Sequence, residues 1–185
     1  LREAEPFEQL RLRPYYEHTA LMKPEWEPVL TELADELRDS RRCLVHGDLS
    51  PKNILAPTDP RSDRAWIIDF EVAHLGDPRF DLAFLLTHLT MKSVHMPAHA
   101  GALDLAARSF IDAYAATAGP DLAPDVAGTM RHVGALLLAR VHGKSPAEYL
   151  TPNGRAHVER LAAPALEGRI PCLEDLFRTR EETRS

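Results

Sequence analysis

The chain has 185 residues, of which 44% are hydrophobic, and this size and composition suit one globular domain or one lobe of a larger one. Its 22 basic and 28 acidic residues give a formal charge of −6, which favours no nucleic-acid partner. Cys43 and Cys172 lie far apart, and no apolar run approaches the ~20 residues that cross a bilayer, so we expect a cytoplasmic protein with no disulfide framework and no membrane partner.

The first 42 residues predict two helices. Residues 1–18 indicate an amphipathic helix that stops near Pro14, because proline breaks a helix interior. Pro24 then opens a clearer helix, with apolar residues at helical spacing, namely Trp26, Leu30, Leu33 and Leu37. Cys43–Val45 follows as a short strand.

Residues 46–55 form the most informative stretch. Asp48 and Asn53 are expected in a loop, because Gly47 and Pro51 oppose both helix and strand. Residues 53–55 predict a return strand, and residues 57–64 a polar turn.

A second apolar run, residues 66–70, predicts a short buried strand that delivers Asp69 to its end. Asp48, Asn53 and Asp69 together offer the hard oxygen ligands that Mg²⁺ takes, with room for water and phosphate oxygens. That combination suits phosphoryl transfer, in which positioning and charge neutralisation supply most of the catalysis.

His46-Gly47-Asp48 with Asn53, followed by Asp69-Phe70-Glu71 and Gly76-Asp77-Pro78 with Asp81, resembles the catalytic core of the aminoglycoside phosphotransferase and choline kinase-like family. Single tripeptides of this kind are also common turn chemistry, whereas three elements in this order and spacing are specific. The resemblance implies small-molecule kinases that share the protein-kinase fold.

The same resemblance implies the role of each residue. Asp48 matches the catalytic Asp, and Asn53 and Asp69 match the ligands that tie Mg²⁺ to the phosphates of ATP. Ser50 and Lys52 are placed on the nucleotide side, although a solvated surface lysine is the favoured interpretation of Lys52.

Three further residues are expected to support the site. His46 matches a structural histidine, and Asp81 matches an Asp that hydrogen-bonds back to the catalytic-loop backbone. Glu71 stands where protein kinases have Gly, and it either adds a carboxylate near the metal or, as we favour, holds the loop.

The nucleotide-covering half of such enzymes has no counterpart here. The nine glycines include no Gly-x-Gly, and no β-rich segment with a Val-Ala-x-Lys lysine precedes His46. We therefore expect residues 1–185 to be a C-terminal lobe, α+β but predominantly helical, with short strands around the catalytic loop and an N-terminal lobe of the same enzyme as partner.

Helices are expected to follow the core. Asp77-Pro78 predicts an N-cap, and 80–89 is apolar nearly all round and therefore buried. Later helices are predicted at 103–118, 126–141, 154–166 and 173–182, with a capping box at 145–148 and a frayed tail at 178–185.

Two further features of the sequence involve histidine and arginine. His95 and His99 have zinc-ligand spacing, but Pro97 breaks the helix between them, which disfavours zinc. Arg140 is a candidate substrate contact, and the favoured alternative is that it pairs with an acid.

The leading hypothesis is an ATP- and Mg²⁺-dependent phosphotransferase that acts on a hydroxyl of an aminoglycoside-, choline- or sugar-like molecule. The alternative is a non-catalytic kinase-like binding or scaffold module. A protein kinase is disfavoured by Gly47 and Ser50, which replace Arg and Lys.

Overall fold

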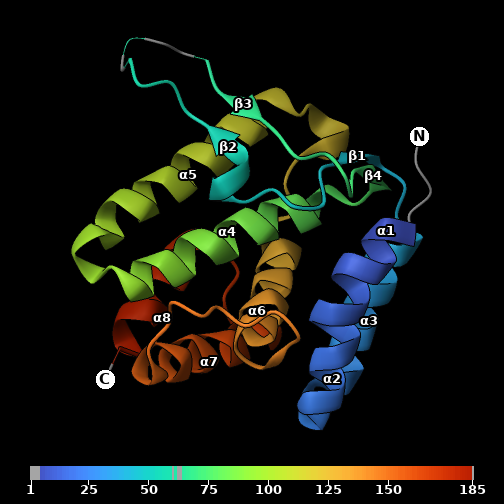
Figure 1. Ribbon diagram of the computed structural model, residues 1–185, viewed down its shortest axis with the longest axis vertical. Helices are drawn as coiled ribbons and strands as arrows, with labels where there is room; N and C mark the ends of the chain where they lie inside the picture. Colours follow the sequence, from blue (N-terminus) through green and yellow to red (C-terminus); the bar gives the residue numbers. More distant parts are fainter. Residues whose placement is uncertain (1–4, 60, 62–63, 185) are drawn as a thin grey trace.

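Helices form most of the molecule. The computed structural model describes residues 5–59, 61 and 64–184 of the chain, and within them there are eight α-helices and two small β-sheets, which lie toward the top in Figure 1. The predicted α+β, predominantly helical class is confirmed. None of the described helices is long and apolar enough to cross a membrane.

The first helical stretch runs past Pro14, so the prediction that it stops there is wrong. It consists of α1 (Glu5–Phe7), the π-helical segment η1 (Glu8–Glu17) and α2 (His18–Met22). In an α-helix the ring of Pro14 would clash with the carbonyl four residues earlier, and the wider π-helical turn relieves that clash. The amide of His18 accordingly donates to the Arg13 carbonyl, five residues earlier.

The second predicted helix is confirmed. A 3₁₀ turn, η2 (Pro24–Trp26), leads into α3 (Glu27–Asp39). The residues predicted at its apolar spacing, Leu30, Leu33 and Leu37, are buried in the main core, and Trp26 packs against that core. Figure 1 shows α1, α2 and α3 side by side.

Two antiparallel pairs of strands flank the candidate catalytic loop. One pairs β1 (Cys43–Val45) with β4 (His74–Gly76), and the other pairs β2 (Ile54–Leu55) with β3 (Trp66–Ile67). Strand β4 was not predicted, because three residues that end in glycine carry too little periodicity to be recognised.

The predicted buried strand over 66–70 is wrong in two respects. Strand β3 ends at Ile67, and the side chains along the run are exposed, with Trp66 at 54% and Ile68 at 41%. The run cannot continue as a strand because Asp69 has φ +72°, a left-handed conformation. The polar turn predicted at 57–64 includes residues 60, 62 and 63, which lie outside the described part of the chain.

Helix α4 (Pro78–His95) begins as predicted. The Asp77 side chain caps it by accepting from the Arg79 amide at 2.9 Å, and Phe80, Leu82 and Leu86 are buried. The 3₁₀ turn η4 (Pro97–His99) then leads into α5 (Ala100–Thr117).

Helix α6 (Val126–His142) lies at the centre of the C-terminal helices and follows the 3₁₀ turn η5 (Pro120–Leu122). It packs against α4 and against α7 (Pro152–Leu166). A Cβ on Gly134 would lie only 2.7 Å from the amide nitrogen of Leu166, so glycine permits the close approach of α6 and α7.

Two predictions near the C-terminus are wrong. No helix begins at the expected capping box 145–148; instead, Thr151 caps α7 by accepting from the Gly154 amide at 3.1 Å. The tail is not frayed, because α8 (Leu173–Glu182) includes Arg180, which is buried and paired with Asp104 at 2.6 Å. Residue 185 lies outside the described residues.

Candidate active site

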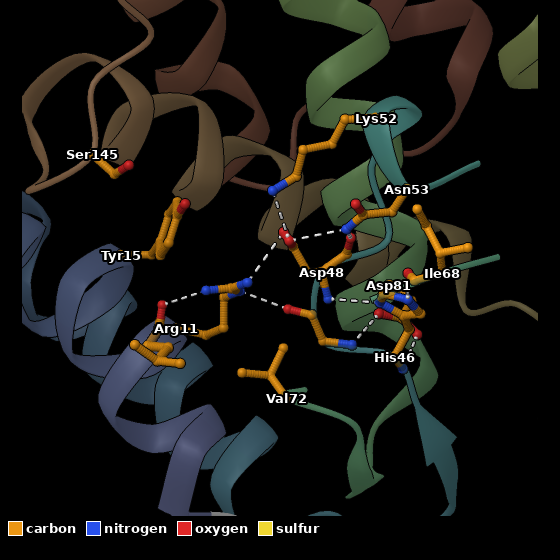
Figure 2. Close-up of polar contacts among 12 residues, drawn as sticks. Arg11, Tyr15, His46, Asp48, Lys52, Asn53, Ile68, Val72, Asp81 and Ser145 are labelled. Carbon is orange, nitrogen blue, oxygen red and sulfur yellow. Dashed lines mark hydrogen bonds and ion pairs between the residues drawn. The ribbon is translucent and has the colours of Figure 1, made fainter. Parts of the chain in front are cut away.

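The loop that carries Asp48 is hydrogen-bonded to the first turn of α4. The carboxylate of Asp81 accepts hydrogen bonds from the amides of His46 at 2.6 Å and Gly47 at 2.9 Å (Figure 2). Burial raises the pKa of Asp81 to about 6, although both amide donors act to lower it. The predicted link from Asp81 to the loop backbone is therefore present in the structure.

Gly47 meets a conformational and a steric requirement at this point. Its φ is +78°, and a Cβ would lie 2.9 Å from the carbonyl oxygen of Val72. Only glycine satisfies both without strain, so the loop can turn sharply immediately before Asp48.

His46 ties the loop to the segment that leads to Asp69. Its Nδ1 accepts from the Asp48 amide at 3.1 Å, so in the neutral ring Nε2 carries the hydrogen and donates to the Ile68 carbonyl at 2.9 Å. Both ring nitrogens are thus occupied by backbone groups. This arrangement leaves His46 no nitrogen with which to take a proton from a substrate.

The carboxylate of Asp48 has three side-chain partners (Figure 2). Its Oδ2 contacts Lys52 Nζ and accepts from Asn53 Nδ2, both at 3.0 Å, and its Oδ1 contacts Arg11 Nη2 at 3.1 Å. A carboxylate oxygen has two lone pairs. Within the described structure, both are used on Oδ2, whereas Oδ1 keeps one available.

Arg11 is a site residue that the sequence analysis missed. It extends from η1, and its Nε donates to the Gly47 carbonyl at 2.6 Å while Nη2 reaches Asp48. Both side chains of this ion pair are almost buried, with 12% of Arg11 and 10% of Asp48 exposed. Arg11 therefore holds the carboxylate and the backbone of the loop together.

Lys52 is exposed, in agreement with its favoured interpretation as a surface lysine, but it also contacts the candidate catalytic residue. Although 68% of its side chain is exposed, its ammonium group forms the ion pair with Asp48. Ser50, which was placed on the nucleotide side, is buried, and its hydroxyl has no hydrogen-bond partner among the described residues. The structure does not bring the Ser50 side chain to the lining of the cavity beside Asp48.

That cavity has a volume of about 420 Å³ and joins residues from five separate parts of the chain. Its lining consists of Arg11, Tyr15, Asp48, Lys52, Asp69, Glu71, Phe84, His88, Arg140 and Ser145. The structure thus brings together four predicted site residues, Asp48, Lys52, Asp69 and Glu71, with the predicted substrate contact Arg140. Asn53 joins them through its hydrogen bond to Asp48.

Asp69 and Asn53 have the chemistry of a magnesium site. Asn53 uses its amide nitrogen on Asp48, and its Oδ1 accepts no hydrogen bond from a described residue. Asp69 is exposed at the cavity and is the one non-glycine residue with positive φ in the described chain, a conformation that Asp tolerates and that is often found at functional sites. An amide oxygen and a carboxylate fit Mg²⁺ with phosphate and water as further ligands.

No cluster of three or more His, Cys, Asp or Glu suited to a metal occurs among the residues that the structure describes. A magnesium ion needs no such cluster, because it is usually bound through one or two carboxylates and keeps several waters. The donor set of Asn53 and Asp69 is therefore compatible with this cation.

Arg140 contradicts the favoured alternative that it pairs with an acid. In the described part of the chain it forms no ion pair, and its Nη1 donates to Ser145 O at 2.6 Å, to Ser145 Oγ at 3.2 Å and to the Tyr15 hydroxyl at 3.4 Å. Burial and the adjacent Arg140 lower the pKa of His88 to about 4, so this imidazole is neutral at pH 7.

Tyr15, His88 and Ser145 also line the cavity without having been predicted there. Arg11 and Tyr15 reach the loop across more than 30 residues of sequence, and no spacing rule relates them to Asp48. The only sequence signal was Pro14 inside a helical pattern, because a proline there marks an irregular turn that is often functional.

Comparison with known families agrees with this geometry. The model of the phosphotransferase enzyme family (APH) matches residues 2–125, which end just before α6 and include the cavity residues up to His88 but not Arg140 and Ser145. A search among curated proteins finds no match. Because the family match covers more than half of the chain and includes Asp48, Asn53, Asp69 and Asp81, the chain belongs to the phosphotransferase enzyme family, which has a protein-kinase-like fold.

Proposed function

We propose that the protein transfers the γ-phosphate of ATP to a hydroxyl group of a small molecule. The observation that carries the proposal is the convergence of Asp48 and Asp69 on one cavity, with Asn53 hydrogen-bonded to Asp48, and the family membership gives independent support for phosphoryl transfer. Positioning and charge neutralisation provide most of the catalysis in such reactions, and these side chains supply both.

Asp48 is the proposed base. The free lone pair on Oδ1 accepts the hydrogen of the acceptor hydroxyl, while Oδ2 stays bound to Lys52 and Asn53. The acceptor oxygen then forms a bond to the γ-phosphorus, the bond from that phosphorus to the bridging oxygen of ADP breaks, and the proton goes to Asp48.

Asn53 and Asp69 are the proposed holders of Mg²⁺. The ion, when bound, neutralises the charge on the phosphates of ATP. Asn53 is oriented for this role by donating its amide hydrogens to the carbonyl and carboxylate of Asp48. Lys52 lies on the same side of Asp48 and places its positive charge where phosphate oxygens would approach (Figure 2).

We further propose that a nucleotide-binding lobe packs onto β2 and β3. Large apolar side chains cluster there with 41–54% of their surface exposed, namely Leu55, Trp66, Ile67, Ile68 and Phe70. Leu55 and Trp66 are cross-strand partners, so the surface is continuous. A patch of this kind usually marks an interaction surface, and this one adjoins Asp69.

Calorimetric titration with Mg²⁺-ATP tests the proposal, using the 185-residue chain and a chain extended upstream. We expect tight binding at least in the extended form and strong loss of affinity in Asp69→Asn. Asp175→Asn, which changes the same charge on α8, serves as the matched control and is expected to bind normally. Absence of Mg²⁺-ATP binding in both forms would contradict the kinase proposal and favour a non-catalytic binding module.

A further inference from the structure

One end of the cavity contains a positive charge with no counter-charge. Figure 2 shows Lys52 and Asn53 on one side of Asp48, and Tyr15 and Ser145 on the other, with Arg11 between them. Arg140 lies on the Tyr15 side, since it hydrogen-bonds both Tyr15 and Ser145. We call the part of the cavity lined by Tyr15, Ser145 and Arg140 the distal end.

The guanidinium of Arg140 is held in place but is not neutralised. Its partners are the uncharged oxygens of Ser145 and Tyr15, and no described carboxylate pairs with it. Its Nε is buried and donates to no described acceptor, whereas its Nη2 is not buried and makes no hydrogen bond to a described residue, so Nη2 is the donor that a ligand can reach. Because a guanidinium has five N–H donors in a rigid fork, a fixed arginine with unused donors at a cavity is suited to bind a planar anion.

The neighbouring groups do not cancel this charge. Asp48 pairs with Arg11 and Lys52 rather than with Arg140, and the imidazole of His88 is neutral at pH 7, so the distal end keeps the positive charge of Arg140. The acidic side chains Asp69 and Glu71 line the cavity as well, but the proposed function assigns Asp69 to Mg²⁺. An ammonium group at the distal end would be repelled, whereas a carboxylate would be attracted.

The free lone pair of Asp48 belongs to the oxygen that contacts Arg11, which lies toward this end. An acceptor whose hydroxyl reaches Oδ1 therefore extends toward Arg140 rather than toward Lys52. We propose that the acceptor is an anionic hydroxylated molecule, which places its hydroxyl on Asp48 Oδ1 and its carboxylate on Arg140; this inference rests on the proposed function. Aminoglycoside- and choline-like cations are correspondingly disfavoured as substrates.

Three sugars with the same pyranose ring and different charges test this proposal: D-glucuronate, D-glucose and D-glucosamine. Their binding is measured by NMR titration at constant ionic strength, with the arginine Nε–H signals as reporters. We expect saturable glucuronate binding, tighter than glucose binding by about tenfold or more, because hydrogen bonds to charged groups are the strong ones. Glucosamine is expected to bind most weakly.

Substitutions assign the effect to Arg140. Arg140→Gln should weaken glucuronate binding to the level of glucose, while Arg140→Lys should retain part of the preference. Arg131→Gln is the matched control, because Arg131 lies on the same helix and pairs on the surface with Glu32 at 3.0 Å. Preserved amide spectra in each variant show that the fold is intact.

Several results would overturn the inference. These are equal affinity for the three sugars, a preference for glucosamine, or no saturable glucuronate binding. A loss of Mg²⁺-ATP affinity in Arg140→Gln equal to its loss of glucuronate affinity would also overturn it, because Arg140 would then serve the nucleotide. Mg²⁺-ATP binding by the unmodified protein is read separately, so failure of the proposed function is distinguishable from failure of this inference.

Discussion

Arg11→Met removes the contact that joins η1 to the catalytic loop while keeping most of the side-chain volume. Arg11 contacts Asp48 Oδ1 at 3.1 Å and donates from Nε to the Gly47 carbonyl at 2.6 Å and from Nη1 to the Leu10 carbonyl at 2.8 Å. Its guanidinium also lies 5.7 Å from the centre of the Phe84 ring. The substitution thus leaves an almost buried carboxylate without the more buried of its two positively charged partners.

The size of the effect follows from this burial. Breaking a buried ion pair by removing one partner costs about 3–5 kcal/mol, because the remaining charge is uncompensated. Lys52 and Asn53 still contact Asp48, so we expect about 3 kcal/mol, at the lower end of that range. Turnover should fall roughly 10- to 100-fold, because Oδ1 is no longer fixed and a small misplacement of a reacting group has an effect of this order.

Urea denaturation measures the stability change and a steady-state ATP assay measures turnover. Arg13→Met is the matched control: Arg13 lies on the same helix, 61% of its side chain is exposed, and its contact with Glu8 is 3.8 Å long. Such a surface pair contributes about 0–1 kcal/mol, so the control should be nearly neutral. If Arg11→Met were as mild as Arg13→Met in both assays, the proposed role of Arg11 would be refuted.

Three further predictions concern the core and the metal site. Gly134→Ala should destabilise the protein by about 1–2 kcal/mol in urea denaturation, because the new Cβ would lie 2.7 Å from the Leu166 nitrogen and force α6 and α7 apart; unchanged stability would argue against this close packing. Burial and the nearby Arg79 lower the pKa of His132 to about 3. The buried neutral imidazole therefore makes its full contribution to protein stability above the ordinary histidine pKa of 6.5, and this contribution is lost as the pH falls toward 3. The free energy of unfolding, measured by thermal denaturation, should therefore fall by about 2 kcal/mol more between pH 6.5 and pH 4.5 in the wild type than in His132→Gln. An equal fall in both proteins would contradict this prediction. Asp69→Asn should keep its stability, since Asn also tolerates the left-handed conformation, whereas Asp69→Ala should lose about 1 kcal/mol in the same denaturation assay; equal stabilities would show that the φ of +72° carries no strain.

The helices were predicted well where local chemistry alone decides them. Helix α8 has the predicted bounds and α6 differs by one residue, because apolar periodicity and end signals act within a few residues. The Asp77 cap is a further case, since the capping carboxylate and its amide lie two residues apart. The loop of Asp48 was likewise indicated by Gly47, whereas Pro51 begins a 3₁₀ turn, η3 (Pro51–Asn53), so that Asn53 does not lie in a loop as predicted.

Predictions failed where tertiary contacts decide the structure. The run from Trp66 to Phe70 has the apolar composition of a buried strand, but its apolar side chains are exposed in this structure. The sequence pattern alone cannot distinguish a segment buried in the core from one that forms an apolar surface. Pro14 is accommodated by a π-helical segment, and Arg180 in the expected frayed tail is fixed by Asp104, 76 residues away.

The candidate site was predicted only in part for the same reason. The residues of the motifs converge as the resemblance implied, but Arg11 contacts Asp48 across 37 residues of sequence and Arg140 meets Tyr15 across 125. Their pairing depends on how η1 packs beside α6, which no local pattern encodes. Of the residues that were not predicted, Tyr15 and Ser145 thus belong to the end of the cavity that we assign to the acceptor.

Turnover of Mg²⁺-ATP by Asp48→Asn tests the central claim most directly. The measurement follows ADP formation by ³¹P NMR, in the form of the protein that binds Mg²⁺-ATP, beside a calorimetric titration of the same sample. The account predicts an unchanged affinity for Mg²⁺-ATP and a fall in turnover of at least about 100-fold, the usual contribution of a positioned base. Turnover close to that of the wild type would contradict the assignment of Asp48 as the catalytic residue.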